Sequence, residues 1–225
     1  MKFKLRPYQE EASKKAVEFF LDKKKNWNAL EVLPTASGKS LILADIAARL
    51  KDKVLVFSPT KEILEQNYKK YCSYGFDNAS IYSASFKSKE ISDVTFATIG
   101  SVKGHPELFT DFKYILIDEV HLVKPESGMY KEFLDKLKSK VIGLTATPFR
   151  LYSYQNYGSI LKFLTRFSRS LFIMFKLRIW QRTDISVFRT ITHAHHHHNG
   201  TKETCSSIQL AVITLTKVSS KNMNV

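Results

Sequence analysis

The sequence predicts an α/β domain built on a mainly parallel sheet, and two observations lead to this fold class. Short runs of β-branched and aliphatic residues recur through the first 150 residues, and segments with helical periodicity separate several of them. Strands that alternate with helices favour a parallel sheet that is covered on both faces and joined by right-handed crossovers. Ligands of such folds bind beyond the carboxyl ends of the strands, so the residues that follow each run are the informative ones.

The individual elements can be read from length, composition and spacing. The predicted strands are ALEVL, KVLVFS, ASIYSA, VTFATI, YILID and VIGLT, at residues 29–33, 53–58, 79–84, 94–99, 114–118 and 141–145. The predicted helices cover residues 6–24, 40–50, 61–75 and 130–140.

Composition narrows the class of protein. The 225 residues are enough to bury a sizeable core, and the net charge of +14 favours a polyanionic partner. The two cysteines form no disulfide framework, which suggests a reducing compartment. The N-terminus turns polar too early for a secretory signal, and no apolar run reaches the roughly 18 to 20 residues that a membrane span needs. We therefore expect a cytoplasmic protein, of a bacterium or a phage-infected host, without membrane contact.

The chain changes character near Arg150. All six prolines and all but two of the 21 acidic residues lie in the first 150 residues. We expect a folded domain at residues 1–150 and a basic tail at residues 151–225, whose degree of order the sequence leaves open. Three interpretations of the tail stand side by side. They are a truncated or frame-shifted gene with the change near residues 165–170, a basic amphipathic helix on a membrane or nucleic acid, and a metal site at His193 and 195–198.

The segment LPTASGKS, residues 33–40, ends like a phosphate-binding loop. In such a loop Gly38 turns backbone N–H groups toward phosphate oxygens, Lys39 reaches the β and γ phosphates, and the Ser40 hydroxyl binds Mg²⁺. A strand is predicted before the loop and a helix after it, which is the required context. The remaining residues of the predicted cradle are Thr35, Ala36 and Ser37. The alternative is that these residues form an ordinary turn between a strand and a helix.

Two residues of this loop depart from the usual pattern. Leu33 stands where the common loop has its first glycine, and Ala36 stands where a further glycine is more usual. The departure at Leu33 leaves the phosphate-binding residues in place, whereas the change at Ala36 predicts a weaker affinity.

The run YILIDEVH places two carboxylates directly after a predicted strand. At that edge of a sheet Asp118 can hold Mg²⁺ through water, and Glu119 can orient or deprotonate an attacking water molecule. Solvated residues that open a loop are the alternative, and the loop at residues 33–40 favours the catalytic interpretation.

Five motifs now stand in order: LRPYQ, LPTASGKS, SPTKEILEQ, DEVH and GLTATP. Together they resemble the superfamily 2 helicases and translocases, and most of all the DEAH-like branch that includes type III restriction helicase subunits and phage branch-migration helicases. The resemblance covers about residues 3–150. It implies a RecA-like P-loop NTPase domain that uses ATP and Mg²⁺ and acts on nucleic acid, with DNA favoured over RNA.

The resemblance implies roles for the residues around the nucleotide. Gln9, aided by Arg6, would read the adenine edge. Lys39 and Ser40 would hold the phosphates and Mg²⁺, and Asp118 would complete the metal site.

It also implies roles in turnover and movement. Glu119 would position the attacking water, and His121 would link the nucleotide site to the neighbouring motif. Thr145 and Thr147 would couple hydrolysis to movement, although a threonine-rich strand end that stops at a proline explains the local pattern as well.

Nucleic-acid contacts are expected at two further strand ends. Pro59, Thr60 and Lys61 offer free N–H groups, a hydroxyl and an ammonium that can follow a phosphate backbone without reading bases. Thr98 and Ser101 would act in the same way.

A superfamily 2 motor needs a second domain, which in the family carries a Q-x-x-G-R-x-x-R motif, and this sequence has no such motif. We therefore expect the chain to hold the N-terminal ATP-binding half of the motor and to be unable to unwind DNA alone. Two alternatives remain open: another P-loop NTPase, such as a small-molecule kinase, and a nucleic-acid-binding module that does not hydrolyse ATP.

Overall fold

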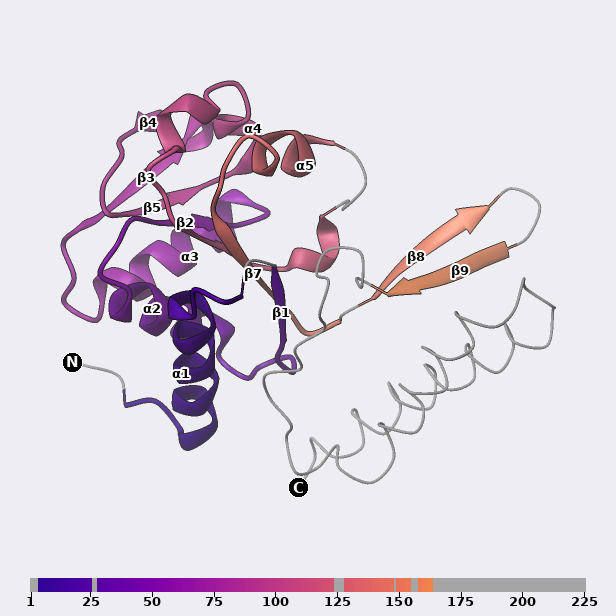
Figure 1. Ribbon diagram of the computed structural model, residues 1–225, viewed down its shortest axis with the longest axis horizontal. Coiled ribbons are helices and arrows are strands. Elements are labelled where there is room, and N and C mark those ends of the chain that lie inside the picture. Colours follow the sequence, from indigo (N-terminus) through magenta and orange to yellow (C-terminus); the bar gives the residue numbers. More distant parts are fainter. Residues whose placement is uncertain (1–3, 26–27, 124–127, 148, 155–157, 164–225) are drawn as a thin grey trace. The chain divides into compact units, whose positions relative to one another are not determined.

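A seven-stranded sheet organises the protein. The computed structural model describes residues 4–25, 28–123, 128–147, 149–154 and 158–163. The strand order is β1-β7-β6-β2-β5-β3-β4 (Figure 1). All neighbours pair in parallel except β3 and β4, which confirms the predicted fold class. The strands are β1 (Ala29–Val32), β2 (Val54–Phe57), β3 (Ala79–Ser83), β4 (Ser88–Lys89), β5 (Val94–Ala97), β6 (Tyr114–Ile117) and β7 (Lys140–Thr145).

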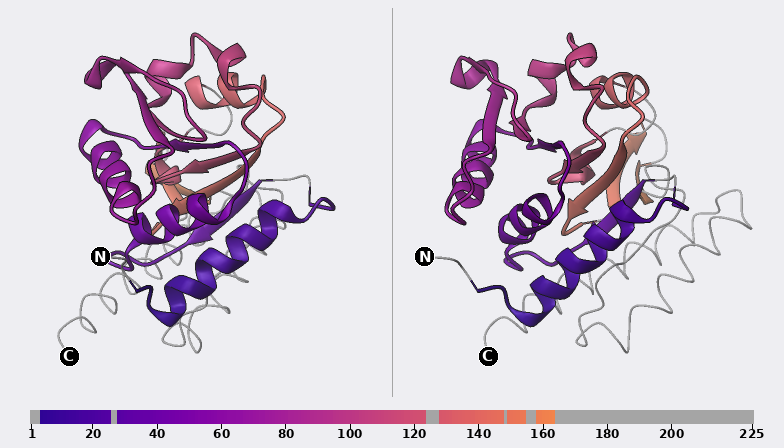
Figure 2. Two further views of the ribbon diagram at one scale, coloured as in Figure 1. Left: turned by 90° about the vertical axis from the view of Figure 1, so that its left-hand side faces the viewer. Right: turned by 60° about the vertical axis from the view of Figure 1, so that its left-hand side comes forward.

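Helices cover both faces of the sheet. On one face lie α1 (Pro7–Leu21), α2 (Lys39–Arg49) and α3 (Lys61–Cys72) (Figure 2). The other face carries α4 (Ile99–Val102) and α5 (Met129–Leu134), together with the short 3₁₀ helices η2 (Pro106–Phe109) and η3 (Val120–Leu122). A further 3₁₀ helix, η1 (Ala84–Phe86), follows β3. The first helix begins at Pro7, whose fixed φ and missing N–H suit the first turn of a helix.

The central strands are buried on both faces, as expected for a parallel sheet between helical layers. Alternate residues of the strands, such as Leu55 and Phe57, pack against Phe109 and Phe133 of the second face. Each such side chain contributes roughly 1.5 to 3 kcal/mol through burial. Gly143 in β7 is needed for the close approach of η3, since a Cβ there would lie 2.7 Å from the Cβ of Val120.

The predicted helix at residues 130–140 is too long, because α5 ends at Leu134 and β7 begins at Lys140. Lys140 instead pairs with Tyr114 of β6 and starts the strand there, and its side chain is also anchored. Its ammonium donates hydrogen bonds to the backbone carbonyls of Phe19, Phe20 and Asp22, at 3.3, 3.0 and 2.5 Å. Carbonyls at the C-terminal end of a helix lack partners within the helix, so a cation from β7 satisfies the end of α1.

Two strands, β8 (Phe149–Tyr154) and β9 (Gly158–Phe163), form a separate two-stranded sheet. The first of them begins at Phe149, so the boundary predicted after residue 150 falls inside an element. The interpretations that concern residues 164–225, including the histidine run, lie outside the described residues. Among the residues that are described, no helix is long and apolar enough to cross a membrane.

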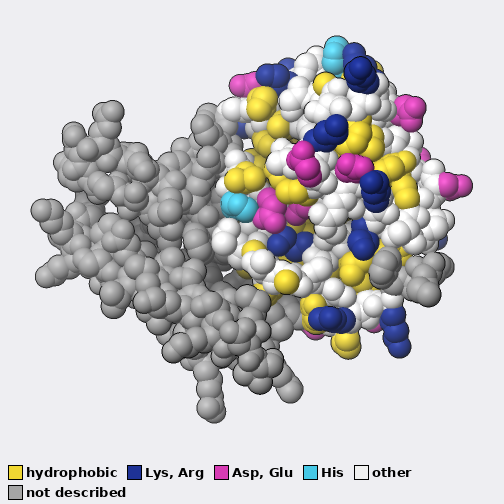
Figure 3. Space-filling view, turned by 180° about the vertical axis from the view of Figure 1, so that it is seen from behind, with side chains coloured by type: hydrophobic (Ala, Val, Ile, Leu, Met, Phe, Trp, Pro, Cys, Tyr) yellow, Lys and Arg dark blue, Asp and Glu magenta, His cyan; other side chains and the backbone are white. Residues whose placement is uncertain are grey.

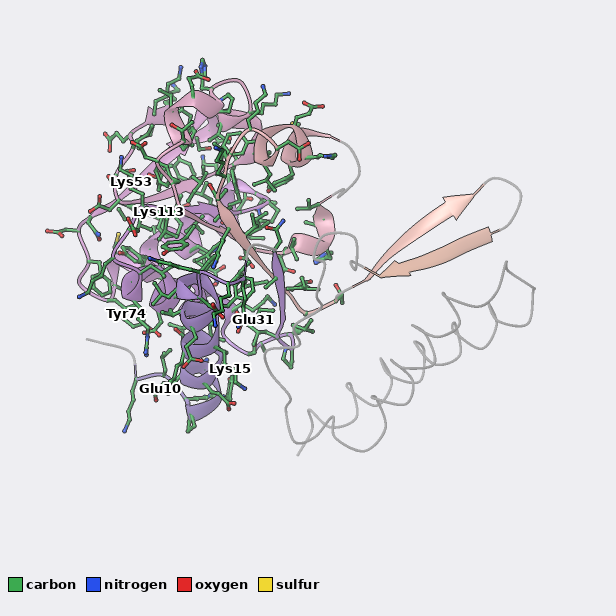
Figure 4. The ribbon with its side chains drawn as sticks, viewed as in Figure 1. Glu10, Lys15, Glu31, Lys53, Tyr74 and Lys113 are labelled. Atoms are coloured by element: carbon green, nitrogen blue, oxygen red, sulfur yellow. The ribbon has the colours of Figure 1, made fainter. Side chains whose placement is uncertain are left out.

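Glu31 is a charged residue type in the interior of the domain. It lies in the middle of β1, its side chain is fully buried, and both carboxylate oxygens lack a hydrogen-bond partner among the described residues (Figure 4). Burial raises the pKa of this carboxyl from 4.5 to about 8, because a charge without a partner is poorly solvated in the interior. Glu31 is therefore protonated in the folded protein at neutral pH.

This carboxyl predicts a stability that declines with pH. Between pH 4.5 and about 8 the unfolded chain releases the Glu31 proton while the folded chain keeps it. The free energy of unfolding then falls as pH rises, by up to about 1.4 kcal/mol per pH unit from this group. Urea unfolding at several pH values should show that Glu31→Gln removes this part of the dependence of the free energy of unfolding on pH. The matched control Glu18→Gln changes an exposed glutamate of α1 and should leave the slope as in the parent chain. Equal slopes in all three proteins would contradict the assignment.

Candidate functional site

The loop at residues 33–40 connects β1 to α2, as the sequence predicts. The backbone N–H of Leu33 donates to the carbonyl of Thr145 at 2.9 Å, which ties the start of the loop to the end of β7. A turn follows, in which the N–H of Ser37 donates to the carbonyl of Pro34 at 3.2 Å. Gly38 is the N-cap of α2, so the free N–H groups of the first helical turn face the loop.

Two loop residues have a left-handed backbone. Gly38 has φ of 80°, and a Cβ at this position would lie 2.4 Å from Nε2 of Gln9. Any other residue would be strained there. Ala36 has φ of 61°, a conformation that costs a residue with a Cβ about 1 to 2 kcal/mol. The sequence analysis expects a weaker affinity from Ala36, and the structure shows that the backbone of this residue is strained.

The loop is braced from α1. Nε2 of Gln9 donates to the carbonyl of Ser37 at 2.8 Å, and Oε1 of Gln9 accepts from the backbone N–H of Arg6 at 2.9 Å. The hydroxyl of Tyr8 donates to the same Ser37 carbonyl at 3.0 Å. Gln9 is buried and Arg6 is exposed. Adenine recognition by Arg6 and Gln9 stays a prediction, and the contacts of Gln9 add a brace for the loop that sequence reasoning missed.

Acidic, basic and histidine side chains lie together on the face seen in Figure 3. A chain of polar contacts joins three of the predicted motifs. The ammonium of Lys39 lies 3.4 Å from Oε1 of Glu119, and Oε2 of Glu119 lies 3.2 Å from Nδ1 of His121. The same Nδ1 lies 2.9 Å from Oγ1 of Thr145. The ends of β6 and β7 and the start of α2 therefore meet at one site.

The threonine motif contacts His121 through the hydroxyl of Thr145. Oγ1 of the buried Thr145 donates to the carbonyl of Thr147 at 3.2 Å and accepts from the N–H of Thr147 at 3.1 Å. The hydroxyl of Thr145 and the carboxylate of Glu119 therefore both lie against Nδ1 of His121.

Asp118 is held through both carboxylate oxygens. Oδ1 accepts from the backbone N–H of Glu119 at 2.9 Å, and Oδ2 accepts from the side-chain amide of Asn67 at 2.9 Å. The same amide donates to Oγ of Ser58 at 3.1 Å. Burial raises the pKa of the Asp118 carboxyl, and the hydrogen bond from Asn67 opposes this effect. Asn67 was not among the predicted site residues.

The predicted nucleic-acid residues lie at the carboxyl ends of the neighbouring strands β2 and β5. Thr60 caps α3, with its hydroxyl 3.4 Å from the N–H of Ile63, and Lys61 follows it on the surface. At the end of β5 the hydroxyls of Thr98 and Ser101 lie 2.9 Å apart. Pro59, which directly precedes Thr60, is half-buried.

Residues of η1, after β3, join these two groups. Oγ of Ser101 accepts from the backbone N–H of Ala84 at 3.0 Å, and the ammonium of Lys61 lies 5.0 Å from the ring centroid of Phe86. Sequence reasoning missed both residues of η1. An aromatic residue two positions beyond a predicted strand was the available signal.

Comparison with known proteins places this site in a family. Residues 2–150 match the family described as Type III restriction enzyme, res subunit. The DNA 3'-5' translocase XPB2 of Sulfurisphaera tokodaii is 31% identical over 152 residues, which are 66% of this chain and 32% of that protein. The chain thus spans about a third of the length of this curated relative.

Solved structures share the fold. The type ISP restriction-modification enzyme LlaBIII bound to DNA matches with a TM-score of 0.56 at 22% identity, over 72% of this chain and 14% of that chain. The UvsW helicase of bacteriophage T4 matches with a TM-score of 0.51 at 24% identity, over 65% of this chain and 54% of that chain. The RecA-like architecture expected from the sequence is confirmed.

The family match covers most of the described residues and includes every residue of the site. The chain therefore belongs to the family of type III restriction enzyme res subunits, and the matched residues 2–150 are the N-terminal motor domain of a superfamily 2 helicase or translocase.

Proposed function

We propose that this domain is the ATP-binding half of a motor that hydrolyses ATP and moves along DNA. The observation that carries the proposal is the contact chain from Lys39 through Glu119 and His121 to Thr145. It joins a phosphate-binding loop, a carboxylate pair and a third strand end at one edge of the sheet. DNA is the proposed track because the similar protein of Sulfurisphaera tokodaii is named a DNA translocase.

The loop suits a triphosphate and Mg²⁺. The free N–H groups at the start of α2, the left-handed Gly38 and the Lys39 ammonium provide donors and positive charge for phosphate oxygens. The Ser37 hydroxyl is buried without a partner among the described residues, so it has a hydrogen bond to offer. Ser40 and Asp118 would hold Mg²⁺, which neutralises charge on the phosphates when it is bound.

The Lys39–Glu119 pair supports the proposed division of labour. Both side chains are largely buried, at 14% and 25% exposure, and they form an ion pair with each other. Phosphate oxygens compete for Lys39, so bound nucleotide leaves the Glu119 carboxylate free to accept a proton from water. His121 holds the other oxygen of Glu119 and thereby keeps that carboxylate oriented.

The DNA contacts are proposed at the ends of β2 and β5. Thr60, Lys61, Thr98 and Ser101 would contact phosphates, which gives affinity without reading the sequence of bases. We further propose that strand separation requires a second motor domain, because DNA must be gripped alternately as a cleft closes and reopens. On this view residues 1–150 form the motor domain and residues 151–225 a basic tail. A cytoplasmic location stays a prediction.

Two substitutions separate nucleotide binding from turnover. Lys39→Ala should weaken ATP binding by roughly a hundredfold, because a charged phosphate donor is lost. Glu119→Gln should keep Mg²⁺·ATP bound and lower hydrolysis by about a hundredfold or more, since it removes the base. Fluorescent-ATP titration and phosphate release in the presence of DNA measure the two effects. Lys51→Ala, at an exposed lysine just beyond α2, is the matched control. Unchanged binding in a folded Lys39→Ala protein would refute the nucleotide site, and parallel losses in Glu119→Gln would refute the assigned roles.

The strained backbone of the loop predicts that a glycine at position 36 increases stability and ATP affinity. Ala36→Gly removes the Cβ from a residue with φ of 61°. It should raise the free energy of unfolding by up to about 1 kcal/mol and tighten ATP binding, because the bound loop conformation becomes easier to adopt. Ala44→Gly, in the interior of α2, is the opposite control and should lower stability by roughly 1 kcal/mol. A lower stability in Ala36→Gly would show that the left-handed conformation carries no strain.

Salt dependence tests the DNA contact. Lys61→Ala should weaken binding to duplex DNA about equally for all sequences and reduce the slope of log affinity against log salt by about 1. The control Lys69→Ala changes an exposed lysine of the same helix that is paired with Glu65 at 2.5 Å. Its salt slope should match the parent chain, and equal slopes for the parent and Lys61→Ala would remove Lys61 from the proposed contact.

A further inference from the structure

Asn67 is a fully buried polar residue that touches two parts of the domain at once. It lies on α3, the helix whose first turn contains the proposed DNA-contacting residue Lys61. Its amide nitrogen donates one hydrogen bond to Oγ of Ser58 at 3.1 Å and another to Oδ2 of Asp118 at 2.9 Å. One planar amide therefore bonds to the end of β2 and to the end of β6.

The register of the sheet explains why a single side chain can reach both groups. Phe57 and Ile117 are paired across β2 and β6, so the residues that follow them, Ser58 and Asp118, emerge next to each other. The N–H of Asp118 also donates to the carbonyl of Phe57 at 2.9 Å. Asn67 is thus the point where α3 is attached to this pair of strand ends.

The orientation of the amide follows from its partners. A flipped Asn67 would place its oxygen against the Asp118 carboxylate, and two acceptors repel each other. In the orientation found, both hydrogens of the amide are used and its oxygen Oδ1 is buried without a partner among the described residues. An unsatisfied buried oxygen is unfavourable, and an apolar side chain would avoid it. The contact with Asp118 gives a reason to retain asparagine here.

We propose that Asn67 is a positioning residue that couples the nucleotide and metal site to the DNA-contacting end of α3. The inference rests on the proposed function, in which Asp118 is part of the metal site. Lys61 is six residues before Asn67 on the same helix, about 9 Å along its axis. A shift of the Asp118 carboxylate on binding therefore moves the amide, and a helix transmits that movement to its first turn. By reciprocity, DNA held at Lys61 affects nucleotide affinity through the same contact.

Hydrogen exchange of the full chain tests the coupling, with Mg²⁺ and the slowly hydrolysed analogue ATPγS as the probe. In the parent chain the probe should slow exchange in the loop at residues 33–40 and, by about tenfold, at Ile63 and Leu64 in the first turn of α3. Asn67→Leu and the smaller Asn67→Ser should keep protection of the loop and lose protection of the first turn.

A matched control distinguishes coupling from a general weakening of α3. Tyr71 is buried on the same helix, and its hydroxyl donates to Asn78 at 2.9 Å. Tyr71→Phe removes a partly buried hydrogen bond without touching Asp118, so protection of the first turn should survive.

The outcomes separate this inference from the function on which it rests. Protection of the loop without protection of Ile63 and Leu64 in the parent chain would overturn the coupling while leaving nucleotide binding intact. Protection of the first turn that persists in both Asn67 variants would also overturn it. Absence of loop protection in the parent chain would refute the nucleotide site, and the coupling with it.

Discussion

The site depends on one constraint, which is that parallel strands all end at the same edge of a sheet. Because β7 lies between β1 and β6, the residues that follow these three strands are forced into one neighbourhood. The hydrogen bond from Leu33 to Thr145 at 2.9 Å holds the loop to β7, and Glu119 lies between Lys39 and His121. Most of the contacts at the site, such as those of Lys39 with Glu119 and of His121 with Thr145, join residues of different elements. Their chemistry exists only after the register of the sheet is formed.

Much of this architecture could be predicted because its signals are local. The six predicted strands all exist, since buried parallel strands are short runs of aliphatic residues bounded by polar ones. The error at residues 130–140 had a physical cause. Periodicity placed Lys140 in the last turn of an amphipathic helix. In the structure it begins β7, and its ammonium bonds to the carbonyls at the end of α1. A contact across the sequence cannot be read from periodicity.

The same limit applies to the site. Motif residues such as Lys39 and Asp118 are recognisable because chemistry restricts their type and spacing. Asn67 has no motif, yet it falls between Leu64 and Tyr71 at the spacing of the buried face of α3. A polar residue on such a face needs a partner, and that signal could have identified it. The partner itself could not have been named, because Asp118 is 51 positions away and meets Asn67 only through sheet register.

The backbone adds a further argument for function. Among the described residues that are not glycine, three have a positive φ, and two of them, Ala36 and Glu119, lie in the loop and at the end of β6. Left-handed geometry is unfavourable for both, and surrounding contacts must maintain it. At Glu119 those contacts are Lys39 and His121, which bind one carboxylate oxygen each. The conformation that strains this residue also directs its carboxylate toward the lysine of the loop. The strained backbone of Glu119 and its ion pair with Lys39 therefore depend on each other, because loss of the lysine would remove one of the two contacts that hold this conformation.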